Sequence, residues 1–208
     1  MPNSNYKYFV GVDPSFRGMG ISIIDTENKK LKFKELSVEV GKGTFAEISK
    51  ASEEMVDLFL TENKEIISVT TRLGMEIPPV TGMYAVKLWA LDTHLYNNLI
   101  MSDNWLFNVP YLKFINKKYD GKKDTKEMMT KIIELFKDYG YEVTTNLKSK
   151  NGKDRKLTSN QLDSFIYAIR MFVKTYMEYG IHDDLITEII ELNDRFLEEK
   201  ETKLGKKF

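Results

Sequence analysis

The sequence has no cysteine and only two histidines, His94 and His182, among its 208 residues. This scarcity excludes disulfide scaffolds, zinc–thiolate sites, iron–sulfur clusters and cysteine nucleophiles. Any bound metal ion must therefore be held mainly by oxygen. Because oxygen ligands suit hard cations, Mg²⁺ or Mn²⁺ is the expected metal.

A long hydrophobic run is also missing. No stretch approaches the roughly 20 consecutive apolar residues that a membrane span needs. The first five residues, MPNSN, lack the apolar core of a signal peptide. With 42% hydrophobic residues, the chain can bury the core of one domain. We expect a cytoplasmic protein that contacts no membrane.

The formal net charge is zero, because 31 basic residues balance 31 acidic ones. The charges are nevertheless separated along the chain. Basic residues crowd two stretches, with Lys113, Lys117, Lys118, Lys122, Lys123 and Lys126 in the first and Lys148, Lys150, Lys153, Arg155 and Lys156 in the second. Acidic residues crowd the C-terminal segment, residues 183–199. The basic clusters could bind phosphates, although such clusters more often form solvated loops.

Short apolar runs separated by turns predict a β-sheet. Residues 8–13 and 20–25 are typical of buried strands, and the more alternating segment 31–38 predicts a third. Their tight links favour an antiparallel meander. Residues 66–76 and 106–109 predict a fourth and a fifth strand, each followed closely by proline.

Capping sequences and helical spacing predict four helices and a further amphipathic segment. Helices are expected to begin at Thr44 and Thr158, which both open a capping box, and to span about 83–101 and 125–139. The helix that begins at Thr158 should end at Gly180.

This order predicts an α/β fold with a mixed five-stranded sheet flanked by helices. We place the domain at residues 1–178. Residues 179–208 then form an acidic, amphipathic helical extension with a tail.

Three carboxylates occupy positions that could bring them together. Asp13 ends the first predicted strand, Glu76 ends the fourth, and Asp163 lies in the first turn of the helix that Thr158 opens. Strand ends can lie side by side in such a sheet, with the start of a helix above them. Each acid also has a simpler interpretation, as a turn residue, a solvated strand end or a helix N-terminal charge.

Clustered carboxylates repel one another unless cations neutralise them. Two divalent ions about 3.5 to 4 Å apart can activate water and stabilise a phosphate undergoing substitution. The pattern therefore predicts metal-dependent hydrolysis of phosphodiester bonds in nucleic acid, with no protein nucleophile and no organic cofactor.

Three motifs in this order resemble those of the RuvC family of Holliday junction resolvases. Residues 11–20 (GVDPSFRGMG) are similar to the first motif, Gly74-Met75-Glu76 to the second, and residues 160–168 (NQLDSFIYA) to the last. Lys126 matches a family lysine, and Lys117 or Lys118 matches another. Together the matches span roughly residues 8–173.

The resemblance implies a ribonuclease H-like fold, a homodimer, and paired nicks in four-way DNA junctions during recombination or repair. It implies that Asp13, Glu76 and Asp163 bind two Mg²⁺ or Mn²⁺ ions. Asn160 stands where the family places an acid or histidine; its amide oxygen can still bind a hard cation, but it carries no charge. The prevalence of small divergent relatives in this family suggests that the protein comes from a phage or from a Gram-positive bacterium. A phage-encoded protein would act in the cytoplasm of the host.

Further residues are candidates for contacts with DNA or with a second copy of the chain. Met83 and Tyr84 follow Glu76 and could stack on an unpaired base. The basic candidates for DNA binding are Lys117, Lys118, Lys122, Lys123, Lys126, Lys153, Arg155 and Lys156. An apolar stripe could form either a dimer interface or part of the core; it contains Leu88, Leu91, Leu95 and Leu99.

Two other functions compete with a nuclease. The chain could bind junctions with weakened or no catalysis, which Asn160 and the lysine clusters favour. Alternatively, residues 13–20 could form the phosphate loop of an actin-like ATPase. That class needs a second phosphate loop and a Gly-rich adenosine site, and the sequence has neither.

Overall fold

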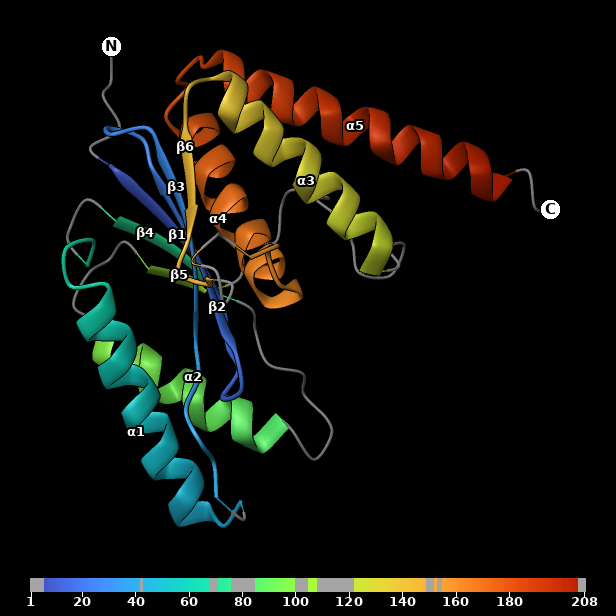
Figure 1. The fold of residues 1–208 in the computed structure, drawn as a ribbon. Helices are drawn as coiled ribbons and strands as arrows, with labels where there is room; N and C mark the ends of the chain where they lie inside the picture. The colour runs from blue at the N-terminus through green and yellow to red at the C-terminus, as the bar shows by residue number, and fades with distance from the viewer. Residues whose placement is uncertain are drawn as a thin grey trace.

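The computed structural model describes residues 6–41, 43–67, 71–75, 85–99, 105–107, 122–148, 152 and 155–205. Within these ranges the chain forms six strands and five helices (Figure 1). The strands are β1 (Tyr8–Asp13), β2 (Met19–Asp25), β3 (Lys30–Leu36), β4 (Thr71–Met75), β5 (Trp105–Phe107) and β6 (Glu142–Thr145). The helices are α1 (Phe45–Glu62), α2 (Ala85–Leu99), α3 (Lys122–Asp138), α4 (Ser159–Glu178) and α5 (Asp184–Gly205).

The strands form one mixed sheet in the order β5-β4-β1-β2-β3-β6. β1, β2 and β3 are an antiparallel meander, as predicted, while β4 and β5 extend the sheet parallel to β1. The mixed sheet and its flanking helices are confirmed. The sixth strand, β6, pairs parallel with β3 at the sheet edge. Its four residues, EVTT, include a single apolar one, which is too few to give an apolar pattern.

The fourth strand is shorter than predicted at its start. Ile66 lies in the turn that follows α1, where its N–H donates to the carbonyl of Asn63 at 3.0 Å. The β-branched residues that predicted one strand therefore belong to two elements. Ile66 lies in the buried turn that ends α1, and the strand itself begins at Thr71.

Helices cover both faces of the sheet (Figure 1). α1 and α2 pack on one face, and α4, α3 and α5 pack on the other. The alternation of β1 explains the two cores, since Val10 and Val12 join the α1 side whereas Phe9 joins the α4 side.

Helix α4 lies directly on three neighbouring strands, each of which has a glycine beneath it. A Cβ placed on Gly11 of β1 would be 1.9 Å from the carbonyl oxygen of Ser164. One on Gly20 of β2 would be 2.0 Å from that of Asn160, and one on Gly74 of β4 would be 3.0 Å from that of Tyr167. Any larger residue would hold the helix away from the sheet. These three glycines therefore set the height of α4 above β2, β1 and β4.

Both ends of α4 are held in place. At the start, Thr158 and Gln161 form the predicted capping box. At the end, Arg72 of β4 donates to Thr175 Oγ1 at 2.9 Å and to Glu178 Oε2 at 2.7 Å. Although burial raises the pKa of the Glu178 carboxyl, its hydrogen bond and ion pair with Arg72 hold that pKa below its usual range. The helix is thereby fixed antiparallel to β1 and β4.

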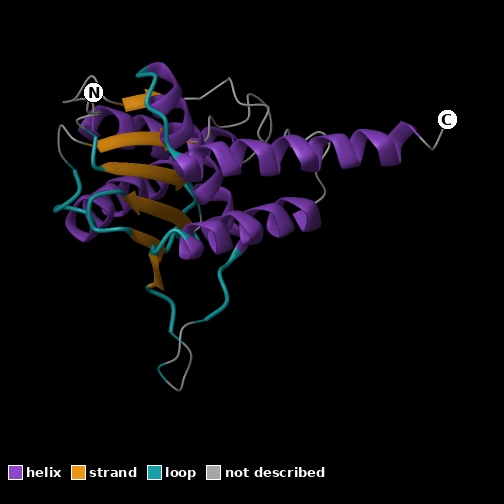
Figure 2. Ribbon diagram, turned by 90° about the horizontal axis from the view of Figure 1, so that it is seen from above, coloured by secondary structure: helices purple, strands orange, loops and turns teal. Residues whose placement is uncertain are grey.

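The predicted C-terminal amphipathic segment is the helix α5. Its first half packs against α3 through Leu185, Ile186 and Ile189, which are at most 5% exposed. Its second half extends past the sheet toward the C-terminus (Figure 2). α3 begins at Lys122, three residues earlier than predicted. In the described part of the chain, no helix combines the length and hydrophobicity needed to cross a membrane.

The apolar stripe of α2 belongs largely to the core. Leu91 and Leu95 are 0% and 1% exposed and pack in the same cluster as α1. The interface interpretation is therefore wrong for these two residues. Leu88 is half-buried, and nothing is described for the side chain of Leu99.

Candidate active site

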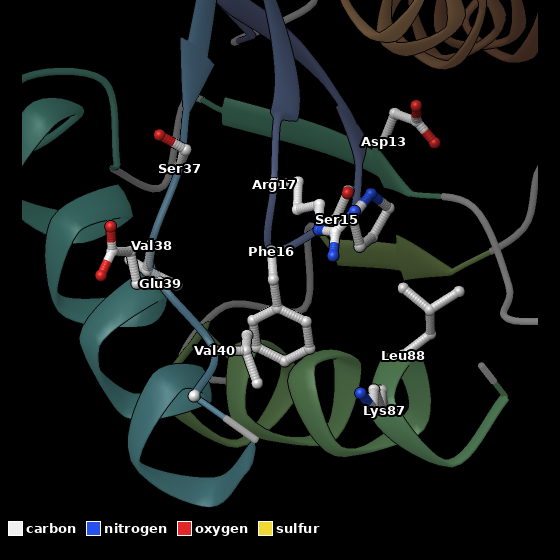
Figure 3. A pocket seen from close by; sticks show the side chains of 12 residues that line it. Asp13, Ser15, Phe16, Arg17, Ser37, Val38, Glu39, Val40, Lys87 and Leu88 are labelled. Atoms are coloured by element: carbon white, nitrogen blue, oxygen red, sulfur yellow. The ribbon is translucent and has the colours of Figure 1, made fainter. Parts of the chain in front are cut away.

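Asp13 is the last residue of β1 and lies on the sheet face that α4 covers. It pairs with Gly20 of β2, just as Gly11 pairs with Ser22. Paired residues of antiparallel strands point to the same face, and both Gly11 and Gly20 lie against α4. Figure 3 shows the Asp13 carboxylate directed away from α2. The half-buried carboxylate is thus presented toward the start of α4.

Asp163 is brought to the same corner by the first turn of α4. Asn160 Nδ2 donates to the carbonyl oxygen of Gly18 at 2.6 Å, and the Asn160 backbone lies against Gly20. The residue after Asp163, Ser164, lies against Gly11. The structure therefore places the turn that carries Asp163 over the ends of β1 and β2, beside Asp13.

Glu76, the third predicted carboxylate, lies outside the described residues. Met75, which precedes it, pairs with Val12, which precedes Asp13. Among the described residues, no three Asp, Glu or His side chains are placed to hold a metal ion. The predicted ligand set is thus described for Asp13, Asn160 and Asp163 only.

Asn160 also has a structural role that its place in the sequence motif does not suggest. Its amide nitrogen donates to Gly18, which leaves Oδ1 as the atom free to bind a cation. A carboxylate at this position could not donate this hydrogen bond. The asparagine therefore ties the start of α4 to the turn between β1 and β2.

We expect Asn160→Asp to destabilise the protein by about 1–2 kcal/mol, because the Gly18 carbonyl would lose its donor and face a negative charge. At roughly 2–4 °C per kcal/mol for a domain of this size, the Tm should fall by roughly 2–8 °C in a calorimetric scan. Ser159→Asp is the control, since it adds the same charge at the start of α4 but leaves the hydrogen bond intact. Equal Tm values for the two variants would contradict a clamping role for Asn160.

The structure describes only some of the basic residues that were predicted to bind DNA. Arg155 and Lys156 are exposed on the segment that leads into α4, close to the candidate site in sequence, and Lys126 is exposed on α3. Lys122 and Lys123 form the start of α3, where only the backbone is described. The other candidates lie outside the described residues: Lys117, Lys118, Lys153, Met83 and Tyr84.

Glu35 of β3 is a carboxylate at this corner that the sequence pattern did not single out. It accepts a hydrogen bond from Thr158 Oγ1, and its Oε1 lies 3.0 Å from the position that a Gly18 Cβ would take. Asn146 bonds both backbone groups of Glu35, at 3.0 and 3.1 Å. Glu35 therefore links β3 both to Asn146, which follows β6, and to Thr158 at the start of α4. In the sequence, Glu35 is one of several polar residues in an alternating strand, and this pattern does not distinguish it from the others.

The strand order, the strand directions and the helix that crosses β2, β1 and β4 define a ribonuclease H-like fold. No known protein family and no curated protein matches the sequence. Among solved structures, the yeast mitochondrial Holliday junction resolvase Ydc2 is similar, with 11% identity and a TM-score of 0.50 over 86% of this chain and 82% of that one.

Two further solved structures share this likeness at lower TM-scores. RuvC of T. thermophilus in complex with a Holliday junction substrate is 12% identical, with a TM-score of 0.45 over 85% of this chain and 98% of RuvC. The human cytomegalovirus terminase nuclease domain is 12% identical, with a TM-score of 0.44 over 81% of this chain and 85% of that domain. At identities this low, the likeness concerns the fold alone. The activity of this chain has to be argued from its own residues.

Proposed function

We propose that this chain is a divalent-metal-dependent endonuclease that nicks branched DNA, four-way junctions in particular. The observation that carries the proposal is the position of the first turn of α4, with Asp163, over the strand pair that ends at Asp13. The turn that carries Asp163 and the strand end that carries Asp13 thereby lie at one corner of a ribonuclease H-like fold. The likeness to Ydc2, a Holliday junction resolvase, supports the choice of substrate.

The donor set fits a hard cation, because it consists of oxygen atoms alone. We propose that Asp13, Glu76, Asp163 and Asn160 Oδ1 hold Mg²⁺ or Mn²⁺, with two ions in each site. The chemistry supplied by such ions is neutralisation of phosphate charge and activation of a water molecule. The residues themselves orient the phosphodiester bond relative to this corner of the sheet.

Exposed basic residues support the binding of DNA beside these acids. Arg155 and Lys156 precede the cap of α4, so a phosphate they hold would lie near Asp163. Lys126 would contact the backbone from α3. We also propose a homodimer, because a four-way junction has approximate two-fold symmetry and a C₂ dimer would present one active site to each of two opposed strands.

Cleavage of four-way junctions, replication forks and linear duplexes, compared side by side in Mg²⁺ and in Mn²⁺, tests this function. We expect paired symmetric nicks in the junction, weaker cutting of the fork, and little cutting of the duplex. Equal cutting of all three substrates would contradict selectivity for branched DNA.

A second candidate function is junction binding without cleavage. Asn160 favours it, because the site has one negative charge fewer than an acid at this position would give, and its amide nitrogen is already bonded to Gly18. This function predicts salt-dependent junction binding with no nicking in either metal. Multiple turnovers by the wild-type protein would rule it out.

A further inference from the structure

A hollow of about 1090 Å³ opens next to Asp13, on the side of the sheet covered by α1 and α2 (Figure 3). Three segments line it: residues 14–17 of the turn between β1 and β2, residues 37–41 after β3, and Lys87 and Leu88 in the first turn of α2. It is large enough for a small organic ligand or a nucleotide. Of the proposed metal ligands that the structure describes, Asp13 alone borders the hollow, at its edge, and its carboxylate is directed away from α2.

Two cationic side chains line the hollow. Arg17 is exposed on the turn between β1 and β2, and Lys87 reaches across from α2. The Lys87 ammonium lies 2.9 Å from the position that a Cβ on Gly43 would take, so it is held against the chain just before α1. Within the described ranges, neither cation has an ion-pair or hydrogen-bond partner. Both are therefore available to an anionic group.

The remaining lining is suited to a base. Phe16, Val38 and Leu88 give the hollow apolar walls. The Val38 N–H donates to the Phe16 carbonyl at 2.9 Å, which ties two of the lining segments together. Glu39 lies at the other end of the hollow from Asp13 (Figure 3). Its carboxylate can accept a hydrogen bond from the exocyclic amino group of a base.

We infer that this hollow binds one or two unpaired nucleotides of a nucleic-acid strand, next to the phosphodiester bond that lies at Asp13. The inference rests on the proposed function, since Asp13 fixes where the strand must pass. An unpaired base can enter a hollow and contact apolar walls, whereas paired bases within a duplex cannot. Arg17 and Lys87 would bind the flanking phosphates. Unpaired nucleotides of this kind occur where the strands of a branched DNA separate.

Because the chain has no cysteine, a single introduced cysteine gives a unique crosslinking position. We choose Ser37→Cys, a near-isosteric change at an exposed residue that lines the hollow. The full-length variant is mixed, in the presence of a metal chelator, with four-way junctions that carry a disulfide-tethered thiol at successive nucleotides around the branch point. Lys64→Cys, exposed just beyond the opposite end of α1, is the control.

The expected result is a crosslink yield at Ser37→Cys at least about tenfold above the control, confined to one or two nucleotides beside the branch point. Equal yields from both cysteines, or a yield independent of nucleotide position, would overturn the inference. Because a chelator is present, this result does not depend on cleavage. Specific crosslinking by a protein whose wild type cuts no DNA would overturn the nuclease proposal and leave nucleotide binding supported.

The salt dependence of binding tests the two cations. The double variant Arg17→Gln/Lys87→Gln should bind the junction more weakly, and the slope of log K against log salt should fall by about 1.4, as expected for two lost contacts to a single strand. Lys50→Gln/Lys64→Gln removes two exposed charges from α1 and its C-terminal turn and serves as the matched control. Identical slopes for the two double variants would overturn the role of Arg17 and Lys87.

Discussion

Asp13→Asn is expected to lower the rate of junction nicking by at least about 1,000-fold, because loss of a proposed metal ligand should remove several kcal/mol of transition-state stabilisation. The change keeps the size of the side chain and removes its charge. Asp13 ends β1 with its backbone paired to β2, so the strand should be unaffected. Junction affinity should stay the same or rise, since one negative charge near the phosphates is removed. Single-turnover nicking and a binding titration measure the two quantities separately.

Asp57→Asn provides the matched control for this prediction. Asp57 is exposed on α1, which covers the other face of the sheet, and the substitution is chemically identical. It should change neither nicking nor binding. Undiminished nicking by Asp13→Asn would remove Asp13 from the active site and, with it, the proposed metal cluster. Loss of binding by Asp13→Asn together with a lower Tm would instead indicate a structural role.

The parts of the fold that were predictable from sequence are those that depend on local patterns. The buried strands β1 and β2 are largely apolar, and α1 and α4 begin at capping boxes that the structure contains. β6 was not predictable, because its pairing with β3 depends on a distant partner and three of its four residues are polar. Pairing of this kind is a tertiary property and leaves little trace in a short segment.

The positions of the candidate site residues were predictable to the extent that these residues stand at element ends. Asp13 and Asp163 were placed by the end of a strand and the start of a helix, and the structure brings these two ends together. The hydrogen bonds that join β3 to the start of α4 and to the residue after β6 were not predictable. Glu35 and Asn146 act through backbone and side-chain hydrogen bonds between elements far apart in the sequence. The hollow beside Asp13 likewise requires three separate segments to meet.

Gly11→Ala is expected to destabilise the protein by about 3 kcal/mol or more, because its Cβ would lie 1.9 Å from the Ser164 carbonyl oxygen and 2.4 Å from the Ala168 nitrogen. Both are backbone atoms of α4 and cannot rotate away as a side chain can. The Tm should fall by roughly 6–12 °C or more in a calorimetric scan. Relief of the contact requires α4 to move off the sheet, which carries Asp163 away from Asp13. The rate of nicking should therefore fall even at temperatures below the Tm, where the variant is folded.

A graded series separates this steric cause from a general intolerance of substitution in the sheet. Gly74→Ala should cost less, because its nearest neighbours are the Met171 Cγ of a movable side chain at 2.8 Å and a backbone oxygen at 3.0 Å. Gly41→Ala should cost least, since the nearest atom, at 2.5 Å, is Oε1 at the far end of the Glu47 side chain in the first turn of α1. If Gly11→Ala yields no folded protein, the difference between the other two variants still measures the effect. Equal Tm values for Gly74→Ala and Gly41→Ala would contradict close contact with α4 as the reason for glycine in these strands.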